Sequence, residues 1–83
     1  MEKWPRRVPP EYRFRELRNR LAAMPLKELR LSAMVQIDLL TAAEARRVVS
    51  PFLAKYPSFF EMPAKGLREL ILAAAEAAEE RSL

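Results

Sequence analysis

One stretch, residues 26–40, constrains the fold of this 83-residue chain more than any other. At the helical spacing of about 100° per residue, five apolar side chains share one face: Leu26, Leu29, Ala33, Ile37 and Leu40. On the opposite side, Leu31, Val35 and Leu39 recur at every fourth position and form a second apolar stripe. A helix that is apolar on two faces has to be covered on both. It is therefore either enclosed by other helices of its own chain or shared with a second molecule.

Helices are predicted on both sides of this stretch. Pro10 suits the first position of a helix over residues 10–24, because its missing N–H would have no partner in a first turn. Four apolar residues then follow at the spacing of a helical seam: Phe14, Leu17, Leu21 and Met24. Thr41 and Glu44 form a capping-box pattern that predicts another helix over residues 42–56. Pro51 lies inside it, so we expect one kinked helix, and the alternative is a separate turn capped by Ser50.

The last helix is predicted over residues 63–82. Its apolar residues lie on one face: Leu67, Leu70, Ile71, Ala74 and Ala78. The connector before this helix contains Phe59 and Phe60, which we expect to plug the end of the bundle. The sequence therefore predicts an all-α fold, a small four-helix bundle packed around residues 26–40. An extended basic arm over residues 1–9 precedes a single helical domain over residues 10–83, because a chain of this length forms one domain.

Composition argues against an enzyme. The chain contains no cysteine and no histidine, so thiolate nucleophiles, cysteine-ligated metals and a side chain that titrates near neutral pH are all missing. The single glycine, Gly66, rules out a glycine-rich loop that would cradle phosphate groups. We accordingly predict no catalytic residue, no metal, no cofactor and no small-molecule substrate.

No apolar segment follows the basic N-terminus, and the longest apolar run, residues 70–75, is far too short to span a bilayer. We therefore expect a cytoplasmic protein that does not enter a membrane. Seven prolines, one glycine and more arginine than lysine give a composition typical of heat-adapted proteins.

Charge is distributed unevenly along the chain. Residues 1–20 carry seven Lys or Arg and three Glu, a net charge of 7 − 3 = +4, whereas residues 61–83 carry three bases and five acids, or 3 − 5 = −2. A basic N-terminal half suits an anionic partner. The arginines that we expect to contact such a partner, whether an acidic protein or nucleic acid, are Arg6, Arg7, Arg13, Arg15, Arg18, Arg46 and Arg47.

These patterns favour a non-enzymatic helical protein-interaction module that self-associates or binds another protein. Its contact surface would consist of Leu31, Val35 and Leu39, with Leu72 as a companion. The alternative is a small nucleic-acid-binding regulator, in which residues 26–40 and 42–56 form a pair resembling a helix-turn-helix and present Arg46 and Arg47. Against that alternative, the turn lacks the usual glycine, and Ala42 and Ala43 offer no polar group to read bases.

Overall fold

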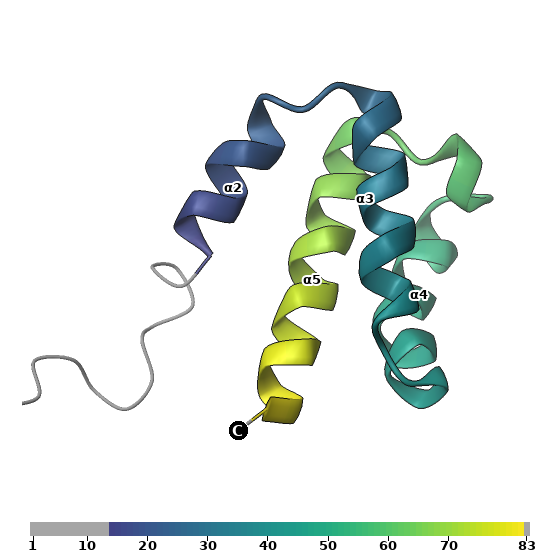
Figure 1. The fold of residues 1–83 in the computed structure, drawn as a ribbon. Coiled ribbons are helices and arrows are strands. Elements are labelled where there is room, and N and C mark those ends of the chain that lie inside the picture. Colours follow the sequence, from purple (N-terminus) through teal and green to yellow (C-terminus); the bar gives the residue numbers. More distant parts are fainter. Residues whose placement is uncertain (1–13, 83) are drawn as a thin grey trace, which may run out of the picture.

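The computed structural model describes residues 14–82, and the side chains of residues 14–80. These residues form four α-helices and one short 3₁₀-helix (Figure 1), in the order α2 (Arg15–Ala22), α3 (Leu26–Asp38), α4 (Ala42–Lys55), η1 (Phe59–Glu61) and α5 (Ala64–Ser82). The predicted all-α four-helix architecture is confirmed. The predicted arm over residues 1–9 lies outside the described residues, as do Arg6, Arg7 and Arg13.

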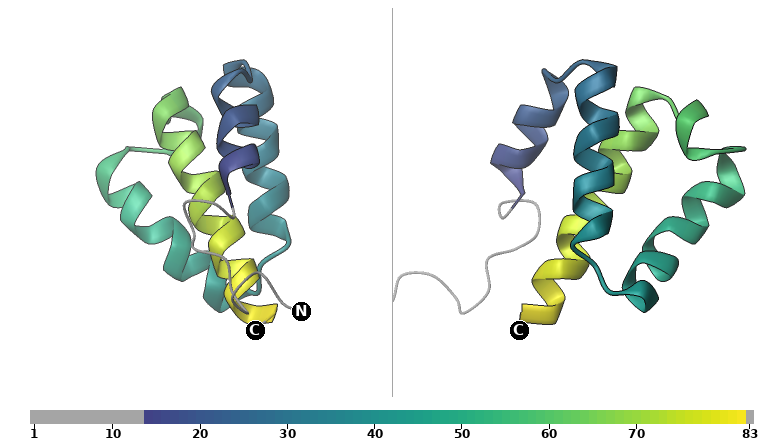
Figure 2. Two further views of the ribbon diagram at one scale, coloured as in Figure 1. Left: turned by 90° about the vertical axis from the view of Figure 1, so that its left-hand side faces the viewer. Right: turned by 45° about the vertical axis from the view of Figure 1, so that its right-hand side comes forward.

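The helices run alternately up and down. α2 and α4 point one way, α3 and α5 point the other way, and α3 and α5 lie side by side between α2 and α4 (Figures 1 and 2). α5 packs against all three other helices, and most extensively against α3. The bundle is therefore organised around α5, and the prediction that residues 26–40 form its centre is wrong.

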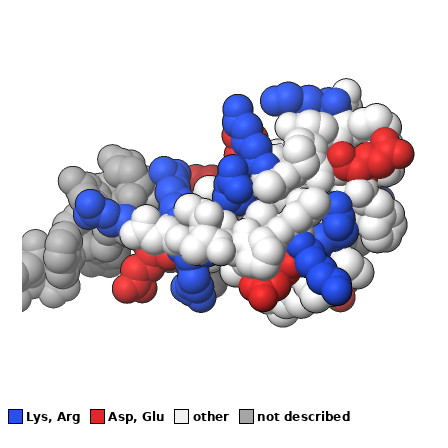
Figure 3. Space-filling model, turned by 90° about the horizontal axis from the view of Figure 1, so that it is seen from above, with Lys and Arg blue, Asp and Glu red and all other residues white. Residues whose placement is uncertain are grey.

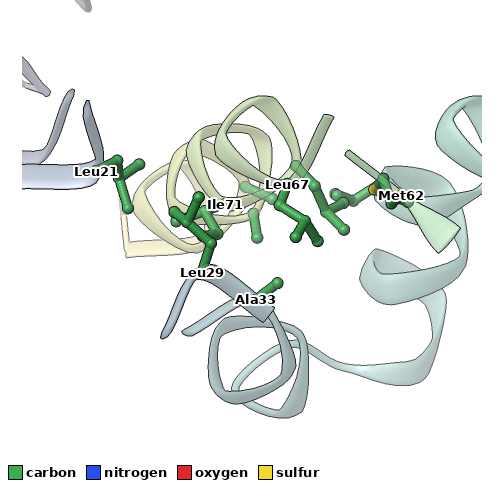
Figure 4. Packing of buried hydrophobic residues seen from close by; sticks show 10 residues of the cluster. Leu21, Leu29, Ala33, Met62, Leu67 and Ile71 are labelled. Carbon is green, nitrogen blue, oxygen red and sulfur yellow. The ribbon is translucent and has the colours of Figure 1, made fainter. Parts of the chain in front are cut away.

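Small side chains and a wide apolar face explain the central place of α5. Leu67, Leu70, Ile71 and Ala74 are buried to 1% exposure or less, and Ala77 is also buried. Alanines at these positions let the neighbouring helices approach closely. Figure 4 shows Leu29 and Ala33 of α3 directed at Leu67 and Ile71, with Leu21 of α2 and Met62 closing the core from the two sides. On α3, only Leu29 and Ala33 are fully buried, since one face of this helix suffices to cover α5.

The capping box at the start of α4 is confirmed. The Glu44 N–H donates to Thr41 Oγ1 at 3.1 Å, and the Thr41 N–H donates to Glu44 Oε1 at 2.9 Å. α4 continues without a break through Pro51, so the alternative of a separate turn capped by Ser50 is wrong. The Ser50 hydroxyl instead donates to the Arg46 carbonyl at 2.6 Å, the usual bond of a serine within a helix.

The connector before α5 behaves only partly as predicted. Phe59 is partly buried against the core, but Phe60 is 70% exposed and does not plug the bundle. The two rings pack edge to face, with centroids 5.5 Å apart. Arg30 Nη2 of α3 donates to the Phe60 carbonyl at 3.1 Å, so η1 is tied to α3 through its backbone. The backbone of Phe60 therefore lies beside α3, and its ring is at the surface.

None of the helices in the described part of the chain combines the length and the apolar character that crossing a bilayer requires.

Candidate protein-interaction surface

The outer face of α3 is an exposed apolar stripe. Leu31 is 59% exposed, and Val35 and Leu39 are each 58% exposed, whereas Leu29 and Ala33 on the opposite face of the same helix are 0% exposed. Because α5 covers only the inner face of α3, the outer face is left at the surface. The sequence predicts two apolar faces on this helix. The structure buries the centre of one face, at Leu29 and Ala33, whereas Leu26 at the start of that face is 43% exposed.

A groove borders this stripe on the side of α4. α3 and α4 diverge from the short turn that joins them (Figure 2, right), and η1 lies near their open end. The groove between them has a volume of about 290 Å³, and its lining residues come from all three elements: Met34, Ile37, Asp38, Val49, Leu53 and Phe59. Leu31, Met34, Val35 and Asp38 are neighbours on a helix, being three or four residues apart. The stripe and the groove therefore form one continuous surface, called the α3 surface below.

Two members of the α3 surface did not follow from the sequence. Helical spacing puts Leu53 on the same apolar face of α4 as Val48 and Phe52, but Leu53 is 47% exposed and lines the groove. Helical spacing puts Met34 at the margin of the inner face of α3, and Met34 is 46% exposed. Helical spacing puts both side chains at the edge of an apolar face, and α4 leans away from α3 instead of closing over that edge. The position of an edge residue depends on this angle between helices, which no local pattern specifies.

Leu72 lies in a different setting from the stripe. It is half-buried, packs against the core, and lines a hollow of about 370 Å³ between α2 and α5. The other residues around that hollow are Arg18, Leu21, Ala22, Lys65, Arg68 and Glu69. Since α2 packs on this side of α5, the structure places Leu72 with α2 and not with Leu31, Val35 and Leu39.

The predicted arginines do not gather on one face. Arg15 and Arg18 are exposed on α2, and Arg46 and Arg47 are exposed on α4. These two helices lie on opposite sides of the pair formed by α3 and α5 (Figure 1). Seen from the end where α3 and α5 begin, lysines and arginines are spread around the bundle, with acidic and uncharged residues between them (Figure 3). Arg15 and Arg18 on α2 therefore lie apart from Arg46 and Arg47 on α4.

Two charged residues flank the α3 surface at its two ends. Lys27 lies in the first turn of α3, and Asp38 is the last residue of this helix. Both side chains are exposed. Glu28 is the acidic residue of the first turn, and the last turn has no basic residue. The α3 surface thus has a basic group near one end and an acidic group at the other.

The chemistry of this surface suits packing more than reaction. Its members are leucine, valine, methionine, isoleucine and phenylalanine side chains, with one carboxylate at the rim. In the described part of the chain, no three acidic side chains come together in a way that would hold a metal ion. Fold and surface together define a small all-α protein with an exposed apolar helix face. Comparison with known proteins gives no match to this chain, either among protein-family models, among curated proteins or among solved structures.

Proposed function

We propose that this chain is a non-enzymatic interaction module that self-associates through the outer face of α3. The observation that carries the proposal is the exposure of Leu31, Val35 and Leu39, each close to three-fifths exposed on a helix whose opposite face carries the fully buried Leu29 and Ala33. Exposed apolar rows of this kind mark contact sites in soluble proteins, because leaving them in water is unfavourable. The same face of a second copy of the chain can cover this one, and two-fold pairing is the commonest symmetry of such contacts.

The groove supports the same proposal. It continues the apolar stripe toward α4 and adds Met34 and Leu53, which are about half exposed, to the area that a partner would cover. Methionine adapts its shape to an incoming surface, and interfaces are enriched in it. Stripe and groove together offer a partner both a ridge and a hollow.

We also propose that the exposed arginines of α2, Arg15 and Arg18, serve a second contact with an anionic surface, which would be an acidic protein. We expect the module to act in the cytoplasm without a cofactor or a small-molecule substrate. Support for these two points comes from composition and from the charge gradient along the chain.

The test is the substitution Val35→Glu, with molar mass measured by light scattering or sedimentation. We expect the unchanged chain to show the mass of a dimer at high concentration, and the variant to show the mass of a single folded chain, because a carboxylate buried in an apolar contact is strongly unfavourable. Ala54→Glu is the matched control, since Ala54 is exposed on α4 and lies outside the α3 surface. This control should remain dimeric.

Two results would contradict the proposal. One is a single-chain mass for the unchanged protein at millimolar concentration. The other is unfolding of Val35→Glu under conditions where Ala54→Glu is folded, which would place Val35 in the core of the protomer. Nucleic-acid binding is tested separately by titrating salt against binding to an arbitrary DNA duplex. If the chain binds the duplex, if this binding falls steeply as salt is added, and if Val35→Glu behaves in the same way, the regulator is favoured over the self-associating module.

A further inference from the structure

The charges on α3 are placed against the dipole of their own helix. The N-terminal end of a helix carries partial positive charge and favours acidic groups, whereas the C-terminal end favours basic groups. Lys27 lies in the first turn and Asp38 is the last residue, so each occupies the end that it disfavours. Within the described residues, no ion pair involves either side chain. Glu28 offsets Lys27 in part, but the last turn has no basic residue that would offset Asp38.

The neighbouring helix does not relieve this placement. α5 packs most extensively against α3 and runs in the same direction, so the positive ends of the two helices lie together (Figure 1). The first turns of α3 and α5 also both carry a lysine, Lys27 and Lys65. A helix that lay antiparallel on the outer face of α3 would bring the opposite dipole and the opposite charge to each end.

Spacing along α3 specifies how such a helix would align. Lys27, Leu31, Met34 and Asp38 follow one another at intervals of four, three and four residues, which places them in one row along the outer face. The row is basic at its start, apolar in the middle and acidic at its end. It is therefore complementary to itself when it is reversed.

We propose that two copies of this chain pair α3 against α3 in antiparallel orientation, with a two-fold axis between Leu31 and Met34. Lys27 of each copy then faces Asp38 of the other, and Leu31 of each copy packs on Met34 of the other. Val35 and Leu39 lie along one flank of the contact. This inference rests on the self-association proposed above and adds its orientation and register.

Charge-reversal variants test this pairing without lowering the stability of the single folded chain. Lys27→Glu and Asp38→Lys each place a favourable charge at an end of α3, so each should leave the thermal midpoint of the monomer unchanged or raise it. Each also replaces an attraction by a repulsion at both symmetry-related contacts of the dimer. We expect the dissociation constant of the dimer to rise about 10- to 30-fold at low ionic strength for either single variant. The double variant should return to within about threefold of the unchanged chain, since it restores both pairs in reverse.

Glu80→Lys is the matched control. Glu80 is an exposed acidic residue near the C-terminal end of α5, so its reversal makes the same electrostatic change at a helix end outside the α3 surface. The dissociation constant of this variant should stay within about twofold of the original value. High salt should reduce the effect of the single α3 reversals but leave the control unchanged.

Cross-linking provides a second readout. The chain has no cysteine, so Lys27→Cys and Asp38→Cys each introduce a unique thiol. When differently tagged chains of the two variants are mixed, a short bismaleimide should join a Lys27→Cys chain to an Asp38→Cys chain. Cross-links between identical chains should be rare, because residues 27 and 38 are eleven positions apart, or about 16 Å along the helix.

The outcomes distinguish the inference from the function on which it rests. A single-chain mass at every concentration overturns both. A dimer that Val35→Glu dissociates, but whose affinity neither α3 reversal changes, overturns the register and leaves the self-association standing. Cross-links that join Lys27→Cys chains to each other indicate parallel pairing and overturn the inference as well.

Discussion

At the scale of single residues, the only glycine of the chain has a packing role. Gly66 is buried in the first turns of α5. A β-carbon at this position would lie 2.8 Å from Met62 Cγ and 2.9 Å from Tyr56 Cε2, closer than such atoms approach one another. Gly66 therefore lets the ring of Tyr56 and the chain before α5 pack directly on the helix backbone.

Gly66→Ala tests this contact, because two effects of opposite sign act on it. Alanine raises helix propensity by about 1 kcal/mol, whereas the clash with Tyr56 and Met62 costs about 1–3 kcal/mol. We expect the clash to dominate and the free energy of unfolding to fall by about 1 kcal/mol in urea denaturation. A variant that is more stable than the original chain would show that the two neighbours move aside at no cost.

Two leucines of α3 make a second residue-scale prediction. Leu29 is 0% exposed and Leu31 is 59% exposed, although they are two positions apart on the same helix. Leu29→Ala should lower the free energy of unfolding by about 2–5 kcal/mol, and Leu31→Ala by less than about 0.5 kcal/mol when the protein is dilute enough to be monomeric. Equal losses from the two substitutions would mean that α3 is covered on both sides within one protomer.

At the scale of elements, the sequence predicts helices well where local chemistry sets their ends. Thr41 and Glu44 mark the start of α4, and the capping box forms as expected. Pro25 directly precedes α3 and occupies its N-cap position. These signals act within one helical turn, so they can be recognised without knowing the fold. The first predicted helix, residues 10–24, is the exception, since it ends at Ala22 and is described only from Arg15.

Pro51 tests the continuity of α4. It lies inside the helix and is exposed, so its ring contributes little to the core, yet it cannot donate to the carbonyl of Arg47. A proline within a helix costs about 3 kcal/mol, and about 1 kcal/mol of this is offset because proline restricts the unfolded chain. Pro51→Ala should therefore raise the free energy of unfolding by about 1–2 kcal/mol. The comparison is made by urea denaturation, and a less stable variant would mean that proline at position 51 fits α4 to α5 better than alanine does.

At the scale of the whole molecule, the sequence predicts the class of fold but not its centre. Both α3 and α5 have enough apolar residues to be central, and their patterns do not rank them. The choice depends on which helix three others pack against, and α5 carries two buried alanines, Ala74 and Ala77, whereas α3 carries one, Ala33. The candidate site is predictable to the same extent. The stripe on α3 follows from its spacing, whereas the groove depends on the angle at which α4 leaves α3.

Self-association would also be visible in the stability of the whole chain, because a contact made only by folded copies stabilises the folded state as concentration rises. When the chain concentration is about a hundredfold above the dissociation constant of the dimer, association stabilises the folded dimer by about 2.7 kcal/mol, or about 1.4 kcal/mol for each chain. For a domain of this size, the midpoint of thermal unfolding should rise by roughly 5–10 °C over that range. Val35→Glu should unfold at the same temperature at every concentration, and Ala54→Glu should follow the original chain. A midpoint of the unchanged protein that is independent of concentration would show that the exposed face of α3 makes no contact between copies.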